Sequence, residues 1–326
     1  MQPLSLVTGA NGHLGNTLVR ELLARGQLVR AGVRDPQHAT QLNTLGCDVV
    51  RAELLDPGSL RQALQGVDVL YQVAAVFKHW AKNPYAEIVE VNVQGTRNVL
   101  RAAAEAGVKR VVYVSSVAAV GHNGQQLDET HWNTDQQNPY YLSKILSERA
   151  AWETAQALEL SMVAVLPSAI IGPNATRLTD TMAFLAAVLE RKLALDPNFH
   201  FNFVDVRDVA DGLIRAAENG RPGQRYILAN RQSSSLAEVI TALNACCPGY
   251  RLPARAPKAL LLLIAWLQEQ LATYTGKPAE LLRSQVRMFY GVQQRYCIDK
   301  AVGELGYQPR PAQEALAQAF MHLLAR

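Results

Sequence analysis

Cysteine is scarce in this chain of 326 residues, which contains four. Cys246 and Cys247 are adjacent, and neither they nor Cys47 and Cys297 show a CxxC pair or a histidine-linked spacing of the kind that metal sites have. This pattern argues against a disulfide framework and suits a reduced, cytoplasmic protein. We therefore predict no metal site and a cytoplasmic location.

Charge is limited too, and long apolar runs are lacking. Charged residues make up 18% of the chain, and the net charge of +4 shows no basic patch that predicts nucleic-acid binding. The apolar run within Lys258–Leu267 is too short to span a bilayer. We predict no membrane span and interpret this run as a core or lid helix, with contact to a membrane surface left open.

What the chain does have is an alternation of short apolar runs and helical patterns. Candidate strands are residues 4–8, 28–33, 48–52, 68–73, 110–115 and 161–166, and helical patterns occupy about 14–25, 36–44, 58–65, 84–106 and 138–157. Such alternation predicts an α/β fold, a doubly wound parallel sheet of the Rossmann type with helices on both faces. Beyond residue 166 the pattern becomes irregular and then mostly helical.

We therefore predict two domains. A nucleotide-binding Rossmann domain comprises residues 1–166 and about 203–230, and a smaller, mostly helical substrate lobe comprises about 167–202 and 231–326. The chain is long enough for this arrangement, and its 49% of apolar residues is typical of globular proteins.

A glycine-rich turn follows the first predicted strand. The segment Thr8-Gly9-Ala10-Asn11-Gly12-His13-Leu14-Gly15 lies between that strand and a helical pattern, which is the context that dinucleotide binding requires. Gly9 permits a tight turn, Gly12 lets the backbone approach a pyrophosphate, and Gly15 lets helix and strand pack closely. The helix N-terminus would then face the phosphates with its free N–H groups.

The end of the second predicted strand indicates which nicotinamide cofactor fits. Sites selective for NAD place a carboxylate there, whereas an arginine accommodates the 2′-phosphate of NADP. Here Val33 stands at the position of the acid, and Arg34 follows at once. We predict NADP as the cofactor. The alternative is that Asp35 does the work of the acid and Arg34 is an ordinary surface residue.

Tyr140 and Lys144 lie four residues apart on a predicted helix, so they share one face of it. A lysine ammonium beside a phenol favours the phenolate and is expected to lower the tyrosine pKa. Such a tyrosine can exchange a proton with a substrate oxygen. Alone, the pair is equally consistent with a solvated helix face.

An ordered set of motifs resembles the extended short-chain dehydrogenase/reductase family over nearly the whole chain. After the glycine turn it comprises Val73-Ala74-Ala75, Val91-Asn92-Val93-Gln94-Gly95-Thr96, Val114-Ser115-Ser116, Tyr140-x-x-Ser143-Lys144, Leu166-Pro167 with Gly172-Pro173, and Phe203 to Ala210. Val33-Arg34-Asp35-Pro36 looks like the dihydroflavonol 4-reductase-like branch. The segment 74–121 is also similar to a bacterial group of sugar epimerases, within the broader epimerase-dehydratase-like set.

The resemblance implies roles for individual residues. The catalytic set would be Ser116, Tyr140 and Lys144, with Asn92 organising the site. The residues implied to bind the cofactor are Gly9, Asn11, Gly12, His13, Leu14, Gly15, Arg34, Glu53, Leu54, Val73, Ala74, Ala75, Tyr140, Lys144, Pro167 and Ile170. Glu53-Leu54 departs from the Asp-Leu that usually binds adenine, which makes that assignment weaker.

The function expected is NADP-dependent reduction of a ketone or aldehyde to the alcohol, with Tyr140 as general acid. Val117-Ala118 follows Ser116 where sugar dehydratases of the family carry Asp-Glu, and the lobe is rich in apolar residues. The partner would be an apolar small-molecule carbonyl compound. One alternative is a nucleotide-sugar epimerase with tightly bound NAD, and another is a catalytically silent NADP-sensing protein. The resemblance suggests a homodimer through the helices of 84–106 and 138–157, and the oligomeric state stays open.

Three histidines lie in loops expected to flank the cleft: His79, His122 and His131. We interpret each as a surface or packing residue and not as a catalyst.

Overall fold

The computed structural model describes residues 2–77, 81–175, 177–276 and 279–326, so that His79 lies outside the described residues. Seven strands form one sheet in the order β10-β7-β5-β4-β1-β2-β3, and every neighbouring pair is parallel. The strands are β1 (Leu4–Thr8), β2 (Leu28–Val33), β3 (Asp48–Arg51), β4 (Val69–Gln72), β5 (Arg110–Val114), β7 (Met162–Pro167) and β10 (Arg225–Leu228). The predicted doubly wound parallel sheet is confirmed.

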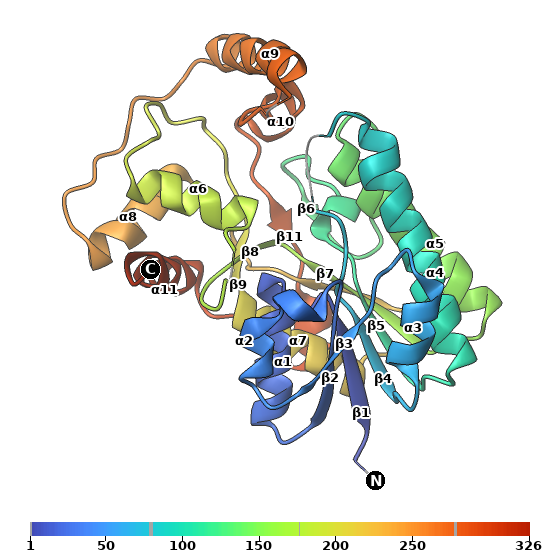
Figure 1. The fold of residues 1–326 in the computed structure, drawn as a ribbon. Helices are drawn as coiled ribbons and strands as arrows, with labels where there is room; N and C mark the ends of the chain where they lie inside the picture. Colours follow the sequence, from blue (N-terminus) through green and yellow to red (C-terminus); the bar gives the residue numbers. More distant parts are fainter. Residues whose placement is uncertain (1, 78–80, 176, 277–278) are drawn as a thin grey trace.

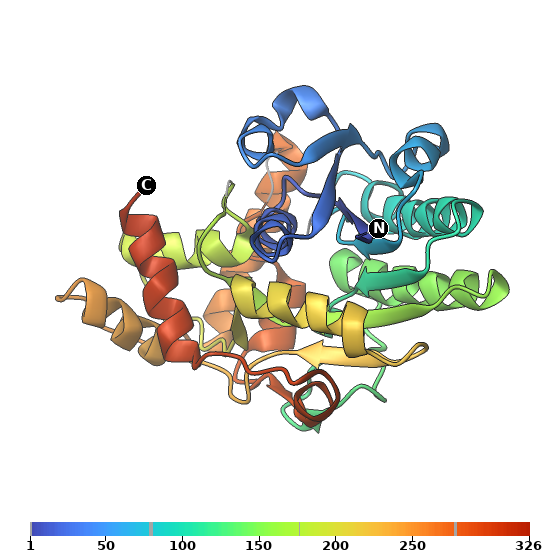
Figure 2. The ribbon, with the colours of Figure 1, turned by 90° about the horizontal axis from the view of Figure 1, so that it is seen from below.

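Helices cover both faces of the sheet (Figures 1 and 2). On one face lie α1 (His13–Ala24) and α7 (Val206–Asn219), and on the other lie α3 (Pro57–Leu64), α4 (Val91–Glu105) and α5 (Pro139–Ala157). The apolar strands are buried between these two layers, as expected for a parallel sheet. Whether α4 and α5 also form a dimer interface stays a prediction.

Two predicted helices differ from the observed ones. The pattern at 36–44 is divided into a 3₁₀ turn, η1 (Pro36–His38), and a short helix, α2 (Thr40–Asn43), because Ala39 between them leaves helical geometry. The pattern at 84–106 begins as a π-helical turn, η2 (Tyr85–Glu90), before α4. Neither break has a clear signal in the apolar periodicity.

The strand order places the functional edge of the sheet. From β1 the chain proceeds to β2 and β3 on one side, and then returns to β4 and the strands beyond on the other. In open sheets of this kind ligands bind outside the carboxyl ends of the strands at the point of reversal. The glycine turn after β1 and the segment after β4 meet there.

The lobe has a core of its own beside this edge. The helices α6 (Asp180–Leu189), α8 (Leu236–Cys246) and α11 (Ala312–Leu324) surround a cluster that includes Met182, Leu185 and Val188 (Figure 1). These apolar residues therefore form the core of the lobe. Two small parallel pairs, β8 (Ala169–Ile171) with β9 (Phe203–Asp205) and β6 (Gln126–Leu127) with β11 (Arg295–Tyr296), complete the strands.

The apolar run at 258–267 begins a longer helix, α9 (Lys258–Thr275), which packs against α10 (Arg283–Phe289) at the top of Figure 1. Only Leu261, Ala265 and Ala272 of α9 are buried among its described residues. The interpretation of this run as a core helix is therefore wrong for its outer face. Within the described ranges, no helix is both long and apolar enough to cross a membrane.

The predicted division into domains remains an interpretation, and one packing relationship bears on it. Tyr296, Ile298, Leu305 and Tyr307 are buried in the same cluster as the seven-stranded sheet. This part of the chain, including η4 (Ala301–Leu305), thus packs with the Rossmann core although the sequence places it in the lobe.

Candidate active site

The glycine turn after β1 has the close backbone approach predicted for it. Gly9 has a φ of +66°, and a Cβ there would lie 2.9 Å from the Cα of Ala74. A Cβ at Gly15 would lie 2.3 Å from the carbonyl oxygen of Gly9. Helix α1 has Gly12 as its N-cap, with no side chain to cap it. The turn therefore leaves a cradle of backbone N–H groups that fits a pyrophosphate.

Thr8, which the sequence analysis did not select, fixes the strand end beside this cradle. Its buried hydroxyl oxygen accepts hydrogen bonds from the backbone N–H of Val73 (3.0 Å) and of Ala74 (3.1 Å). The same hydroxyl donates to the Oε1 of Gln72 at 2.8 Å. The segment Val73-Ala74-Ala75 is thus held against the glycine turn, where the sequence analysis placed it along the cofactor.

His13 links the turn to the segment after β7. Its Nε2 donates to the carbonyl oxygen of Pro173 at 2.7 Å, and burial lowers the pKa of its imidazole. Pro167 ends β7 and Ile170 lies in β8, so both precede this anchored carbonyl at the same edge of the sheet. Leu14 is buried in the sheet core.

Arg34 stands directly after β2, which is the position expected for a residue that binds the 2′-phosphate of NADP. Its side chain is 80% exposed, and its Nε lies 3.0 Å from an oxygen of Glu53. Asp35 is occupied locally, because its carboxylate accepts from the backbone N–H of Gln37 (2.9 Å) and pairs with His38 (2.7 Å). The hydrogen bond with His38 lowers the pKa of Asp35. These contacts make Asp35 a cap of η1 and favour Arg34 as the residue available to a ligand.

Glu53 and Leu54 have different surroundings. Glu53 pairs with Arg34, so the acid assigned to adenine and the arginine assigned to the 2′-phosphate are in contact. Leu54 is buried against α4. A Cβ added to Gly95 of α4 would lie 2.8 Å from the Cβ of Leu54. The Nδ2 of Asn98 donates to the carbonyl oxygen of Leu54 at 2.9 Å.

Ser116 and Tyr140 come together at the carboxyl end of β5. The strand ends at Val114, and Ser116 caps the short 3₁₀ turn η3 (Val117–Ala119), accepting from the N–H of Ala118 at 3.1 Å. The Oη of Tyr140, in the first turn of α5, lies 3.5 Å from the Oγ of Ser116. Both hydroxyls can therefore reach one oxygen atom of a substrate.

The pKa of Tyr140 is raised to about 12, chiefly by burial, although the hydrogen bond with Ser116 lowers it. The direction is opposite to the sequence expectation, because burial of the phenol outweighs any effect of Lys144. In this state of the protein Tyr140 keeps its proton at neutral pH and is a proton donor.

Asn92 holds two elements beside this pair of hydroxyls. Its Nδ2 donates to the carbonyl oxygen of Val76 (2.9 Å) and to the Oγ of Ser143 (2.8 Å). Its Oδ1 accepts from the backbone N–H of Val76 at 2.7 Å. Ser143 is the neighbour of Lys144 on α5, so Asn92 positions the segment after β4 against the helix that carries Tyr140 and Lys144.

Lys144 is buried, and burial lowers its pKa to about 8, while the charge of Glu148 one turn further along α5 raises it. Glu148 is fully buried and pairs with Arg225 of β10, with Nε to Oε1 at 2.7 Å. Glu148 also accepts from the hydroxyl of Ser115 at 2.5 Å. The hydroxyl of Ser115 thus contacts α5, whereas that of Ser116 lies near Tyr140. The ion pair between Glu148 and Arg225 was not predicted from the sequence, because its two residues lie 77 positions apart.

Aromatic side chains surround Tyr140. Phe77 lies edge-on to its ring at a centroid distance of 4.8 Å, and Tyr141 lies at 5.7 Å. His122 stacks on Phe289 of α10 at 4.9 Å, and burial lowers its pKa to about 4. His122 is therefore a neutral packing residue, consistent with its interpretation from sequence.

His131 is a surface residue. Its side chain is half exposed and its Nδ1 lies 2.7 Å from a carboxylate oxygen of Asp128. Its ordinary surface contacts agree with the expectation that it is not a catalyst.

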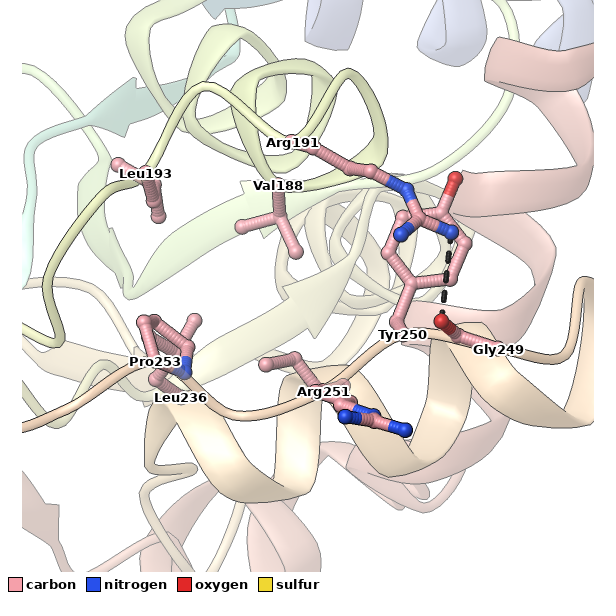
Figure 3. A pocket seen from close by; sticks show the side chains of 9 residues that line it. Val188, Arg191, Leu193, Leu236, Gly249, Tyr250, Arg251 and Pro253 are labelled. Atoms are coloured by element: carbon pink, nitrogen blue, oxygen red, sulfur yellow. Dashed lines mark hydrogen bonds between the residues drawn. The ribbon is translucent and has the colours of Figure 1, made fainter.

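Two hollows lie away from these residues. One of about 490 Å³ lies between α6, α8 and the segment Gly249–Pro253, with Arg191 over the ring of Tyr250 at 4.5 Å (Figure 3). The other, of about 500 Å³, lies beside Asn230 and Tyr307. Among the residues that the structure describes, neither lining includes Ser116, Tyr140 or Lys144. The candidate site is therefore defined by its side chains and by the strand ends.

The sheet topology, the glycine cradle and the Ser116–Tyr140–Lys144 arrangement define a dinucleotide-dependent enzyme fold. The chain belongs to the NAD-dependent epimerase/dehydratase family, whose model matches residues 5–229. It is similar to a cinnamoyl-CoA reductase of Medicago truncatula, with 35% identity over 268 residues, covering 76% of this chain and 82% of the relative. It is also similar to a dihydroflavonol 4-reductase of Callistephus chinensis, with 26% identity over 343 residues, covering 97% and 92%.

A solved structure, that of gox2253, superimposes with a TM-score of 0.85 at 32% identity and covers 99% of this chain and 98% of the other. These findings confirm the resemblance to the dihydroflavonol 4-reductase-like branch that the motifs indicated.

Proposed function

We propose that this protein is an NADP-dependent reductase that converts an apolar ketone or aldehyde to the alcohol. The observation that carries the proposal is the 3.5 Å approach of the Tyr140 and Ser116 hydroxyls, with Lys144 one helical turn from Tyr140. The glycine cradle adjoins the same edge of the sheet. Support also comes from relatives that are named as reductases.

The residues present fit a nicotinamide dinucleotide. The N–H groups at the start of α1 would hold the pyrophosphate, because Gly9 and Gly15 leave no side chain in the way. Arg34 would pair with the 2′-phosphate of NADP. Val73 and Ala74, held by Thr8, would line the cofactor with small side chains. Lys144 would hold the nicotinamide ribose.

Each catalytic side chain then has a chemical task. When bound, NADPH supplies the hydride that reduces the carbonyl carbon. Ser116 donates a hydrogen bond to the carbonyl oxygen, where negative charge develops. Tyr140 donates its proton to the same oxygen, which its raised pKa allows it to retain until that charge forms. Lys144, in its charged form, stabilises the tyrosinate that remains.

The surroundings of Tyr140 favour an apolar, aromatic substrate. Phe77 and Tyr141 flank its ring, and Phe199 and Phe289 continue the same cluster. Aromatic rings of this kind pack against planar apolar ligands. The names of the two relatives denote substrates with aromatic rings, which agrees with this assignment.

The test is a panel of aromatic and aliphatic ketones and aldehydes, followed by NADPH absorbance. We expect net oxidation of NADPH with one alcohol formed per NADPH consumed, and faster turnover of aromatic members. If the purified protein contains bound NAD and gives no net turnover of added cofactor, the result would favour the nucleotide-sugar epimerase instead. Binding of NADPH without turnover of any carbonyl compound, sugar nucleotides included, would favour the catalytically silent sensor.

A further inference from the structure

The outer face of α9 is largely apolar, with Gln270 and Thr273 as exposed polar residues beside its apolar side chains. The exposed apolar side chains are Leu260, Leu263, Trp266, Leu267, Leu271 and Tyr274. Their exposed fractions range from 39% at Leu260 to 96% at Tyr274. A surface helix of a globular protein normally turns polar residues to water. We call these six residues the outer stripe of α9.

Two neighbouring polar residues in the middle of α9, Gln268 and Glu269, make contacts on its inner side. Gln268 accepts from the backbone N–H of Leu281 at 2.8 Å. Glu269 accepts from the backbone N–H of Arg283 at 2.8 Å and pairs with its guanidinium at 2.5 Å. The helix thus binds α10 through polar groups and presents leucine and tryptophan outward. Contiguous exposed apolar surface of this kind marks an interaction site.

Charge beside the outer stripe identifies the occupant. Residues 249–291 contain six lysines and arginines and two glutamates, which gives this segment a net charge of +4. The entire chain has the same net charge. The excess of positive charge is therefore concentrated in this segment. Arg255, Lys258 and Arg287 of this segment are exposed, and the exposed Arg251 lines the hollow between α6 and α8. An apolar face with flanking cations is complementary to a membrane surface that contains anionic lipids.

A second copy of the chain fits less well. Pairing of two outer stripes would bring two segments of the same positive charge together, and like charges disfavour such contacts. Trp266 adds to the case for a bilayer, because tryptophan is enriched at membrane–water interfaces. Lys258, the first residue of α9, stands where a lysine side chain can reach lipid headgroups. Arg255 precedes the helix and stays 66% exposed although its Nε lies 3.7 Å from a carboxylate oxygen of Asp196.

We propose that α9 docks this protein on an anionic membrane surface, lying in the interface with its outer stripe inserted and without spanning the bilayer. The inner side of the same helix connects this surface to the candidate site. Leu261 and Ala265 belong to one buried cluster with Tyr140 and Phe289. An apolar molecule dissolved in the bilayer would meet the protein at a helix whose inner side belongs to the cluster of Tyr140. The docking itself does not depend on the reductase function.

The experiment uses the full chain with vesicles of phosphatidylcholine alone or mixed with phosphatidylglycerol. We expect sedimentation with the mixed vesicles, weaker sedimentation with phosphatidylcholine alone, and release by salt. Brominated acyl chains should quench the fluorescence of Trp266. Trp266→Phe should remove that quenching while the protein still sediments.

The decisive variants lie on the outer stripe and on a matched face elsewhere. Leu263→Glu with Leu267→Glu should lower the partition coefficient about tenfold or more, because two leucines no longer leave water. Met321→Glu with Leu324→Glu changes equally exposed residues of α11 and should leave it unchanged. Circular dichroism and melting identify any variant that fails to fold.

Equal sedimentation of the α9 double variant and the wild type would overturn the proposal. So would absence of binding to the mixed vesicles. A dimer in gel filtration that the α9 double variant abolishes, with no vesicle binding by the wild type, would assign the outer stripe to a second copy instead.

Discussion

The phenol oxygen of Tyr140 lies 3.5 Å from the hydroxyl oxygen of Ser116, although the two come from different elements. Ser116 is placed by the end of β5 and the turn η3, and Tyr140 by the first turn of α5, which Asn138 caps. The pair creates one point at which two donors can reach a carbonyl oxygen. Neither residue alone would distinguish a catalytic site from a helix cap.

The selectivity for NADP should depend on Arg34. We expect Arg34→Ala to raise the KM for NADPH about tenfold or more, because the charge-assisted contact to the 2′-phosphate is lost. The KM for NADH should change little. Glu53→Gln is the opposing variant, since it removes the carboxylate that pairs with Arg34 at 3.0 Å, and it should lower the KM for NADPH. Steady-state kinetics with both cofactors checks this, and equal increases for NADPH and NADH in Arg34→Ala would exclude the role.

The pH profile should report Lys144. Burial lowers its pKa to about 8, so the ammonium is lost as the pH rises through that value. We expect kcat/KM for NADPH, which reflects ionisations of the free enzyme, to fall above about pH 8. In Lys144→Arg the guanidinium stays charged, so the residual activity should not fall in this range. A descending limb that is the same in both proteins would assign the ionisation to another group.

The buried ion pair between Glu148 and Arg225 should be important for stability. Glu148→Gln leaves Arg225, which is itself buried, without its carboxylate, and we expect a loss of about 3 to 5 kcal/mol in the free energy of unfolding. Glu153→Gln on the same helix is the matched control, because its pair with Arg97 is exposed at 3.7 Å and is expected to cost at most about 1 kcal/mol. Urea denaturation measures both. Similar losses in the two variants would show that the buried Glu148 pair contributes no more to the free energy of unfolding than the exposed pair does.

His122 should make the protein less stable in acid. Its pKa falls from 6.5 in the unfolded chain to about 4 in the folded protein, so the unfolded state binds the proton more readily between these values. The stability that depends on neutral His122 is present above pH 6.5 and is lost as the pH falls towards 4. The shift corresponds to about 3 kcal/mol. The difference in unfolding free energy between pH 7 and pH 4 should shrink by most of that amount in His122→Phe. An unchanged difference would contradict the assignment.

Local patterns in the sequence were sufficient to predict the sheet, and the catalytic set stays a prediction that the geometry supports. The strands β1 and β2 have the predicted bounds, because short apolar runs next to glycines specify buried strands. The four-residue spacing of Tyr140 and Lys144 placed them on one helix face, and the roles of Ser116, Tyr140 and Lys144 came from the resemblance of their motifs to the family. The structure brings Ser116 and Tyr140 into contact.

Relationships between distant segments could not be predicted in this way. Arg225 is 77 residues from Glu148, and no local periodicity indicates that they pair. Phe289 reaches the surroundings of Tyr140 only because α10 folds back over them. The direction of the Tyr140 pKa was also missed, because a helical spacing shows the neighbouring charge but not the depth of burial.

The measurement that tests the mechanism most directly is turnover by Tyr140→Phe, combined with NADPH binding. The substitution removes one oxygen atom and keeps the ring that packs against Phe77. We predict that NADPH binds to the variant with nearly the affinity it has for the wild type, and that kcat for carbonyl reduction falls by a factor of about 100 to 10,000, the usual contribution of a general acid. Retention of wild-type turnover by a variant that binds NADPH would contradict the account, because the proton would then come from another group.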